Sequence, residues 1–462
     1  LGSILLSTII AAYYLQSSPG GWWRPCLCVS LGTVLVVVLF VLTRYFTEVS
    51  SHPVNDIKES TRTGPATVII TGLSVGFESA AWSLLMVAFI LVVSYAIFGT
   101  LSSLPVSDRL IYILYGIALT GVGMMALTGD NLAMDSFGPI ADNANGIGEM
   151  AWTKRKDKKT LAARRIMNSL DEAGNTTKAI TKGVAIGSAV IAAVSLFGTY
   201  IVDVSNVQAR AGLPLAEQLI SVGIRISIPK VLVGMLIGGL LPFLFSSFAL
   251  KAVGRAASKI VDEVRRQFKA GALSGKVKPD YYKIVQLCTM AAQRELLPMA
   301  ILVVLTPILV GILLQVEALG GFLAGAILSG QLMAVFMANA GGAWDNAKKA
   351  IEDEPKDPAH DLGKGSERHK ASVVGDTVGD PLKDTAGPAL NPMIKVVNLV
   401  SVIIAPILAR YTEWSPGSWL IVIVILVILA GCYHQSTKSV SGQWRHMIRQ
   451  GFGNWMKNRE NG

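Results

Sequence analysis

The chain has 462 residues, of which 52% are hydrophobic and only 16% are charged, and its mean hydropathy is +0.50. A soluble protein of this length could not bury so much apolar surface. The formal net charge of +10 would be compatible with a protein that binds nucleic acid. However, the basic residues are concentrated in alternate loops between apolar runs, so we expect no nucleic-acid partner.

Apolar runs long enough to cross a bilayer recur along the whole chain. A hydrocarbon core about 30 Å thick takes about 20 helical residues to cross. The runs extend over residues 1–15 (incomplete), 23–45, 64–99, 106–150, 176–203, 227–265, 286–316, 319–352, 374–411 and 416–434. The sequence therefore predicts an all-α fold, a polytopic transmembrane helix bundle with about ten spans. We expect residues 1–462 to form a single integral membrane domain.

The loops between these runs differ in charge. Three are rich in Lys and Arg: residues 154–165, 251–278 and 348–370. Three others carry very few charges: residues 99–107, 317–320 and 412–418. By the positive-inside rule the basic loops lie in the cytoplasm, and alternation places a tail at 435–462 there as well. The connection 204–226 is a weaker case, because it contains Arg210 and Arg225.

Ionisable residues gather at the predicted cytoplasmic ends of four helices. The groups, in chain order, are Asp135 with Asp142; Asn175 with Lys178 and Lys182; Asp345 with Lys348 and Lys349; and Asp376, Asp380 and Asp384 with Lys383. A single group of this kind could be a solvated helix end. Four groups on one side of the membrane indicate a functional site, because charge at membrane depth is costly.

The last group, in VVGDTVGDPLKDTAGPALNPMIKVV, is the most informative. Asp376, Asp380 and Asp384 stand at i, i+4 and i+8, so on a helix all three carboxylates project from one face. Such a row is unfavourable without a cation between its members, and Lys383 adjoins it. A polar loop at 346–373, which we expect to be a cytoplasmic active-site loop, connects it to Asp345. Carboxylates with lysines suit Mg²⁺ and a polyphosphate anion.

Several long segments closely resemble those of membrane-bound, ion-pumping pyrophosphatases. They are GPIADNANGIGEM, DEAGNTTKAITKGVAIGSA, EVRRQF, MANAGGAWDNAKK and HKASVVGDTVGDPLKDTAGPALNPMIKVVNLVS. The resemblance implies a Mg²⁺-dependent enzyme that hydrolyses pyrophosphate on the cytoplasmic side and pumps protons, or in some branches sodium. Members are homodimers with sixteen or seventeen spans in each subunit. This chain is therefore expected to be the C-terminal portion of such a protein, without the family's other acidic block.

The resemblance also implies roles for individual residues. Those that match metal-binding aspartates are Asp142, Asp345, Asp376 and Asp380. Those that match groups around the pyrophosphate are Asn175, Lys182, Lys348, Lys349 and Lys383. Asp384 matches a carboxylate that orients the attacking water, and Lys395 matches a lysine deeper in the same helix, in the ion path.

The segment GNTTKAITKG indicates which branch of the family the chain resembles. Potassium-dependent members typically have Ala and Gly where this chain has Lys178 and Thr181. A lysine ammonium there can take the place of a bound potassium ion. The resemblance therefore implies a potassium-independent proton pump, in the cell membrane of a prokaryote or an acidic internal membrane of a eukaryote. The alternatives are a sodium pump and an inactive or truncated relative that keeps the helical scaffold.

Overall fold

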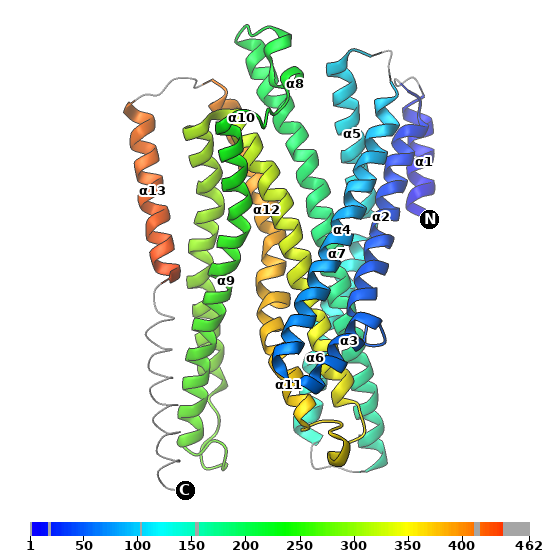
Figure 1. The fold of residues 1–462 in the computed structure, drawn as a ribbon, viewed down its shortest axis with the longest axis vertical. Coiled ribbons are helices and arrows are strands. Elements are labelled where there is room, and N and C mark those ends of the chain that lie inside the picture. Colours follow the sequence, from blue (N-terminus) through cyan, green and yellow to red (C-terminus); the bar gives the residue numbers. More distant parts are fainter. Residues whose placement is uncertain (1, 17–19, 102–103, 153–156, 411–415, 438–462) are drawn as a thin grey trace.

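The computed structural model describes residues 2–16, 20–101, 104–152, 157–410 and 416–437. Within these ranges the chain is helical and contains no β-strand, apart from a single bridge between Asp357 and Leu362. The helices pack as one elongated bundle (Figure 1). The predicted all-α bundle is thus confirmed.

Eight of the described helical segments are long and apolar enough to cross a membrane, which indicates an integral, multi-pass membrane protein. They are Trp23–Thr63, Pro65–Gly99, Val106–Trp152, Lys158–Arg210, Pro229–Lys269, Tyr281–Glu352, Glu367–Leu408 and Pro416–Thr437. The prediction of about ten spans differs from this number for two reasons. The first apolar run forms only a short helix, Ile4–Tyr14, and two predicted spans lie within the single segment Tyr281–Glu352.

The described α-helices have the following bounds: α1 Gly2–Tyr14, α2 Trp23–Thr47, α3 His52–Ser60, α4 Pro65–Gly99, α5 Val106–Met124, α6 Thr128–Trp152, α7 Lys158–Arg210, α8 Leu219–Val222, α9 Pro229–Lys269, α10 Tyr281–Glu352, α11 Glu367–Pro381, α12 Gly387–Leu408 and α13 Pro416–Thr437. The predicted loop at 346–373 comprises the end of α10, a connection at 353–366 and the start of α11.

Helix α10 is two helices joined at a reversal. Gln315 has φ 70° and ψ 177°, which is not helical, and it separates two halves of a 72-residue element. The two halves run in opposite directions, and the first lies beside α9 (Figure 1). Lys230 donates a hydrogen bond to Gln315 Oε1 at 2.7 Å, and Arg225 pairs with Glu317 at 3.0 Å. These contacts hold a backbone conformation that is uncommon for a residue other than glycine.

The two ends of the bundle differ in character. The connections after α9 and α10 lie at the lower end of the view, with α11, whereas α8 and the reversal of α10 lie at the upper end (Figure 1). The basic regions 251–278 and 348–370 therefore share one end, in agreement with the predicted sidedness. The sidedness itself stays a prediction. Most of the predicted tail at 435–462 lies outside the described residues.

Trp344 joins three helices at the lower end. Its ring is fully buried, and its Nε1 donates a hydrogen bond to the carbonyl oxygen of Val68 in α4 at 2.8 Å. Glycines make room for the ring: a Cβ atom would lie 2.1 Å from Trp344 Nε1 at Gly72, and 2.9 Å from the ring at Gly375 in α11. The neighbouring residue, Asp345, is thereby fixed relative to α4 and α11.

We expect Gly72→Ala to destabilise the protein by about 1–3 kcal/mol, because the added methyl group overlaps an immobile indole ring. A thermal unfolding curve in detergent would measure the change. Gly239→Ala in α9 is the matched control, since a Cβ atom there meets nothing within 4 Å. Equal unfolding temperatures for the two variants would contradict the role assigned to Trp344.

Candidate active site

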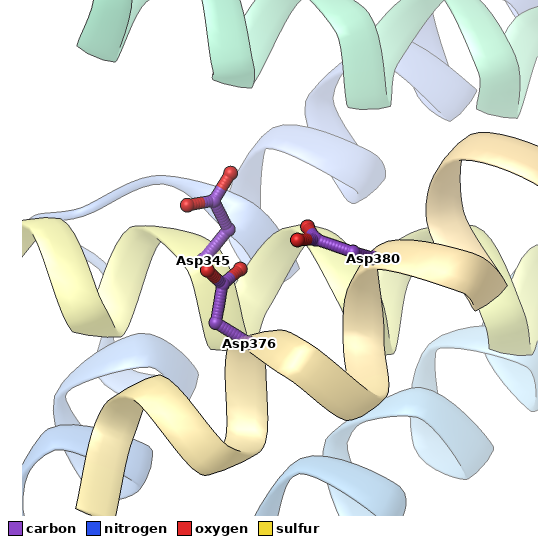
Figure 2. A group of neighbouring side chains, drawn as sticks. All are labelled: Asp345, Asp376 and Asp380. Carbon is purple, nitrogen blue, oxygen red and sulfur yellow. The ribbon is translucent and has the colours of Figure 1, made fainter. Parts of the chain in front are cut away.

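Three carboxylates from two helices meet at the lower end of the bundle. Asp345 projects from α10, and Asp376 and Asp380 project from α11 into the same space (Figure 2). One oxygen of each lies within 4.8 Å of one oxygen of each of the others. Asp345 and Asp376 are buried, whereas Asp380 is exposed. The predicted i, i+4 pairing of Asp376 and Asp380 on one face is confirmed.

Two lysines lie between these carboxylates. Lys383 Nζ is 2.5 Å from Asp345 Oδ2, 2.8 Å from Asp380 Oδ1 and 3.7 Å from Asp376 Oδ1. Lys348 Nζ is 2.5 Å from Asp376 Oδ2 and 3.2 Å from Asp345 Oδ1. Two ammonium groups thus offset most of the repulsion among three carboxylates, and this allows two acidic helices to approach each other.

Helix α7 supplies a polar face to this cluster. Asn175 Nδ2 donates a hydrogen bond to Asp345 Oδ2 at 3.0 Å. Lys178 Nζ lies 2.8 Å from Asp142 Oδ2 and 3.5 Å from Asn175 Oδ1. Asp142 of α6 is therefore linked to the three carboxylates through two polar side chains of α7, and it lies outside their immediate group.

The predicted row of three aspartates on one face is wrong for its third member. Residues Leu382–Ala386 form a π-helical turn, which contains more residues per turn than the α-helix. This turn rotates Asp384 away from the face of Asp376 and Asp380. Asp384 Oδ1 instead accepts a hydrogen bond from Lys182 Nζ at 2.8 Å, and the same ammonium group donates to the carbonyl oxygen of Lys383 at 2.7 Å.

Three other predicted site residues have their own surroundings. Lys349 Nζ pairs with Asp171 Oδ1 of α7 at 2.9 Å, and Thr181 donates a hydrogen bond to Asp135 Oδ1 at 3.1 Å. Lys395 lies in α12 with an exposed side chain. Among the described residues it has no ion-pair partner, so the structure does not bring it to the cluster.

Sequence reasoning missed Asp171. This buried aspartate pairs with Lys349 and accepts a hydrogen bond from Asn145 Nδ2 at 3.0 Å. A signal was available, because Asp171, Asn175, Lys178 and Lys182 follow one another at steps of four, three and four residues and so share a helix face. Asp171 is the first member of that face.

The connection between α10 and α11 is anchored beside the site. Arg368, only 5% exposed, lies 3.3 Å from Glu354 Oε2 and donates to Thr61 Oγ1 at 3.2 Å. Lys58 Nζ also lies 2.9 Å from Glu354. Burial raises the pKa of Glu354, but the hydrogen bond from Lys58 and the charge of Arg368 outweigh it and hold the pKa below its ordinary value. Helix α11 is thus tied to α3 at its first turn.

Two cavities adjoin the cluster. The smaller, of about 10 Å³, is lined by Asn175, Lys178, Lys182, Asp345, Lys383 and Asp384 among others. The larger, of about 290 Å³, lies between α6, α7 and α12, and Asp135, Lys182 and Asn391 line it. Lys182 lines both cavities, so it stands between the carboxylates and the larger space.

The donor set of this site fits a hard divalent cation. All three ligand groups are carboxylates, which magnesium and calcium prefer. Asp376 Oδ1 is buried and accepts no hydrogen bond from the described residues, so it has a lone pair free for a metal. The neighbouring lysines could bind phosphate oxygens as point charges.

We expect Asp376→Asn to weaken divalent-cation binding at least tenfold, because it removes the charge of a buried ligand. The Mg²⁺ concentration at which the unfolding temperature rises half-maximally would measure the change without an activity assay. Asp108→Asn, an exposed acid in the first turn of α5, should leave this concentration unchanged. An unaltered midpoint for Asp376→Asn would remove it from the metal site.

A comparison with known families gives a match over most of the chain. The sequence profile described as "Inorganic H+ pyrophosphatase" matches residues 1–404. A K(+)-insensitive pyrophosphate-energized proton pump of Chloroflexus aurantiacus is 52% identical over 416 residues, which are 88% of this chain and 51% of that protein. A protein of the same name in Streptomyces coelicolor is 45% identical over 404 residues, 87% of this chain and 49% of that one.

A third relative is named as a sodium pump and not as a proton pump. A protein of Clostridium tetani, provisionally named a K(+)-stimulated pyrophosphate-energized sodium pump, is 43% identical over 413 residues, 89% of this chain and 56% of that protein. The chain thus spans about half the length of the curated relatives it matches.

Proposed function

Because the chain belongs to the inorganic H+ pyrophosphatase family, we propose that it forms part of an enzyme that hydrolyses inorganic pyrophosphate at the cytoplasmic surface and couples this reaction to proton pumping. The observation that carries the proposal is the cluster of Asp345, Asp376 and Asp380 with Lys348 and Lys383 at one end of a membrane bundle. A passive carrier needs no such arrangement at its cytoplasmic surface.

The chemistry of the cluster suits phosphoanhydride hydrolysis. This reaction depends on neutralising charge and aligning a water molecule more than on covalent catalysis. Magnesium, the metal we propose, supplies Lewis-acid stabilisation of the phosphate oxygens when it is bound. Asp345, Asp376 and Asp380 would hold it together, and Asp142, which pairs with Lys178 outside this group, is the fourth ligand we propose. Asn175, Lys182, Lys348, Lys349 and Lys383 would contact the pyrophosphate.

We assign to Asp384 the orientation of the attacking water. Its ion pair with Lys182 fixes the carboxylate beside the small cavity and keeps it apart from the metal-binding group. A carboxylate held in this way can accept the proton of the water. Lys395, three turns further along α12, remains a candidate for the ion path, although the described residues give it no partner.

The surroundings of Lys178 support potassium independence. Its side chain is only 13% exposed and its ammonium group lies between Asp142 and Asn175, which disfavours a lysine that merely faces water. A fixed positive charge at this position can replace a bound potassium ion. Thr181 contacts Asp135, so its part is indirect. Proton transport follows the names of the more similar relatives, and sodium transport is the alternative.

Other parts of the proposal rest on the family alone. The homodimer, the single integral domain and the location in a prokaryotic cell membrane or an acidic eukaryotic membrane stay predictions. The competing hypothesis is that the protein is an inactive relative that keeps only the helical scaffold.

The decisive experiment is an assay of Mg²⁺-dependent pyrophosphate hydrolysis in membranes that carry the full-length protein. We expect activity in the wild type and a loss of at least 100-fold in Asp384→Asn, with pyrophosphate binding largely retained because the metal-binding carboxylates remain. Asp108→Asn again serves as the control. No hydrolysis by the wild type would favour the inactive scaffold, whereas near-normal turnover in Asp384→Asn would remove this residue from the mechanism.

Replacing Lys178 by Ala should make hydrolysis respond to potassium, because the site then lacks its fixed cation. Hydrolysis would be measured with and without added potassium. Lys159→Ala, an exposed position in the first turn of the same helix, is the control and should change nothing. If the wild-type activity already rises several-fold with potassium, the hypothesis that the Lys178 ammonium group replaces a bound potassium ion is wrong.

A further inference from the structure

Gln331 is a polar side chain sealed inside the bundle. It lies in the second half of α10 and is 1% exposed, and both its Oε1 and its Nε2 are buried without a hydrogen-bond partner among the described residues. An amide in such a position is costly unless something satisfies it, and a polar buried site that protein groups leave unsatisfied typically binds water. This side chain therefore indicates a binding site for a small polar species.

The position of Gln331 on α10 connects it to α7. Residues eleven apart lie on nearly the same face of a helix, since eleven residues make about three turns. Gly320 and Gly342 are each eleven residues from Gln331. A Cβ atom at Gly320 would lie 1.9 Å from Ile224 and 3.6 Å from Tyr200 of α7. One at Gly342 would lie 3.4 Å from Thr47 of α2 and 3.5 Å from Ala179 of α7. Among these contacts, helix α7 is the one helix that both positions approach, so we infer that Gln331, between them on this face, is directed toward α7.

The third wall of this region is α12. Gly330, the neighbour of Gln331, lies against α12, because a Cβ atom there would be 2.9 Å from Ile394. Helices α7 and α10 also line cavities at both of their ends; the π-helical turn Leu382–Ala386 joins them at one end, and α12 joins them at the other. The cavity beside Asp345 lies at one end, and a cavity of about 210 Å³ lies at the other, lined by Gln208, Gln315 and Leu408 among others.

Gln331 is close to halfway between these cavities. It is fourteen residues from Asp345 and sixteen from Gln315, or about 21 Å and 24 Å along a helix that rises about 1.5 Å per residue. Ala338, seven residues from both Gln331 and Asp345, lines the cavity at the carboxylate end. The face that carries the candidate active site therefore continues down to Gln331.

We propose that Gln331 binds an internal water molecule that relays protons midway along the region enclosed by α7, α10 and α12. This proposal rests on the proposed function and adds a positioning residue to it. The amide offers both a donor and an acceptor, so it can hold the water in either orientation. The water accepts one proton from the side of Asp345 and releases another toward Gln315, and it is unchanged after each transfer.

Asn339 provides a matched control. It is fully buried in the same helix, and both atoms of its amide also lack a hydrogen-bond partner among the described residues. Asn339 is eight residues from Gln331, so its side chain is rotated by about 80° around the helix axis relative to that of Gln331. Asn346 is seven residues further on and lies on nearly the same face as Asn339. It donates a hydrogen bond to the carbonyl oxygen of Thr47 in α2. Asn339 is thus a buried amide outside the proposed path.

The test uses the full-length protein in proteoliposomes, with pyrophosphate hydrolysis, proton uptake and binding of non-hydrolysable imidodiphosphate measured separately. Gln331→Leu should keep the Kd for imidodiphosphate within about twofold and the unfolding temperature at or above that of the wild type. Its hydrolysis and proton uptake should fall at least tenfold. Gln331→Asn, which keeps an amide, should recover part of the loss, and Asn339→Leu should pump normally.

A measurement on the wild type covers the case in which Gln331→Leu does not fold. Radiolysis of water labels methionines next to internal water, and Met393 lies beside Gly330 while being only 2% exposed. Met393 should be oxidised faster than Met124, which is equally buried in the apolar core. Equal oxidation rates, or normal pumping by Gln331→Leu, would overturn the proposal. A wild type that hydrolyses no pyrophosphate would instead contradict the proposed function.

Discussion

The contact of the Lys383 ammonium group with Asp345, Asp376 and Asp380 is the interaction on which the rest of the site depends. Three carboxylates so close together would force α10 and α11 apart without a cation between them. The backbones can approach because Gly341 of α10 has no side chain; a Cβ atom there would lie 2.6 Å from the carbonyl oxygen of Gly379. Close packing and charge neutralisation therefore require each other, and a cation that binds here must share the carboxylates with lysine.

The π-helical turn at Leu382–Ala386 divides one acidic segment between two sets of contacts. In a regular helix Asp384 would join Asp376 and Asp380 on one face and add to their mutual repulsion. The turn instead directs it to Lys182 of α7, where the ion pair holds its carboxylate apart. A single extra residue per turn thus separates a group suited to binding metal from one suited to accepting a proton, and π-helical turns are frequent at functional sites for reasons of this kind.

The sequence predicted the helical bundle and the residues of the carboxylate–lysine cluster, because apolar length and four-residue spacing are local properties. It could not predict the rotation of Asp384, since periodicity arguments assume 3.6 residues per turn throughout. It also could not show that Lys349 pairs with Asp171 and not with the three carboxylates, because this pairing depends on how α7 and α10 pack. Gln331 carried no signal at all: a single glutamine in an apolar run becomes informative only when its burial and its missing partners are known.

The second half of α10 links the two ends of the bundle. It begins at the reversal at Gln315, which Lys230 holds in a left-handed conformation, and it ends with Trp344 and Asp345 fixed against α4 and α11. Both ends are therefore constrained by contacts with other helices, and a shift of Asp345 when ligands bind would be transmitted along a rigid segment to Gln315. Because α7 and α12 pack against the same segment, such a shift would also alter the space around Gln331. The helix that carries the buried acid of the candidate site is thus the element that connects this site to the opposite end of the bundle.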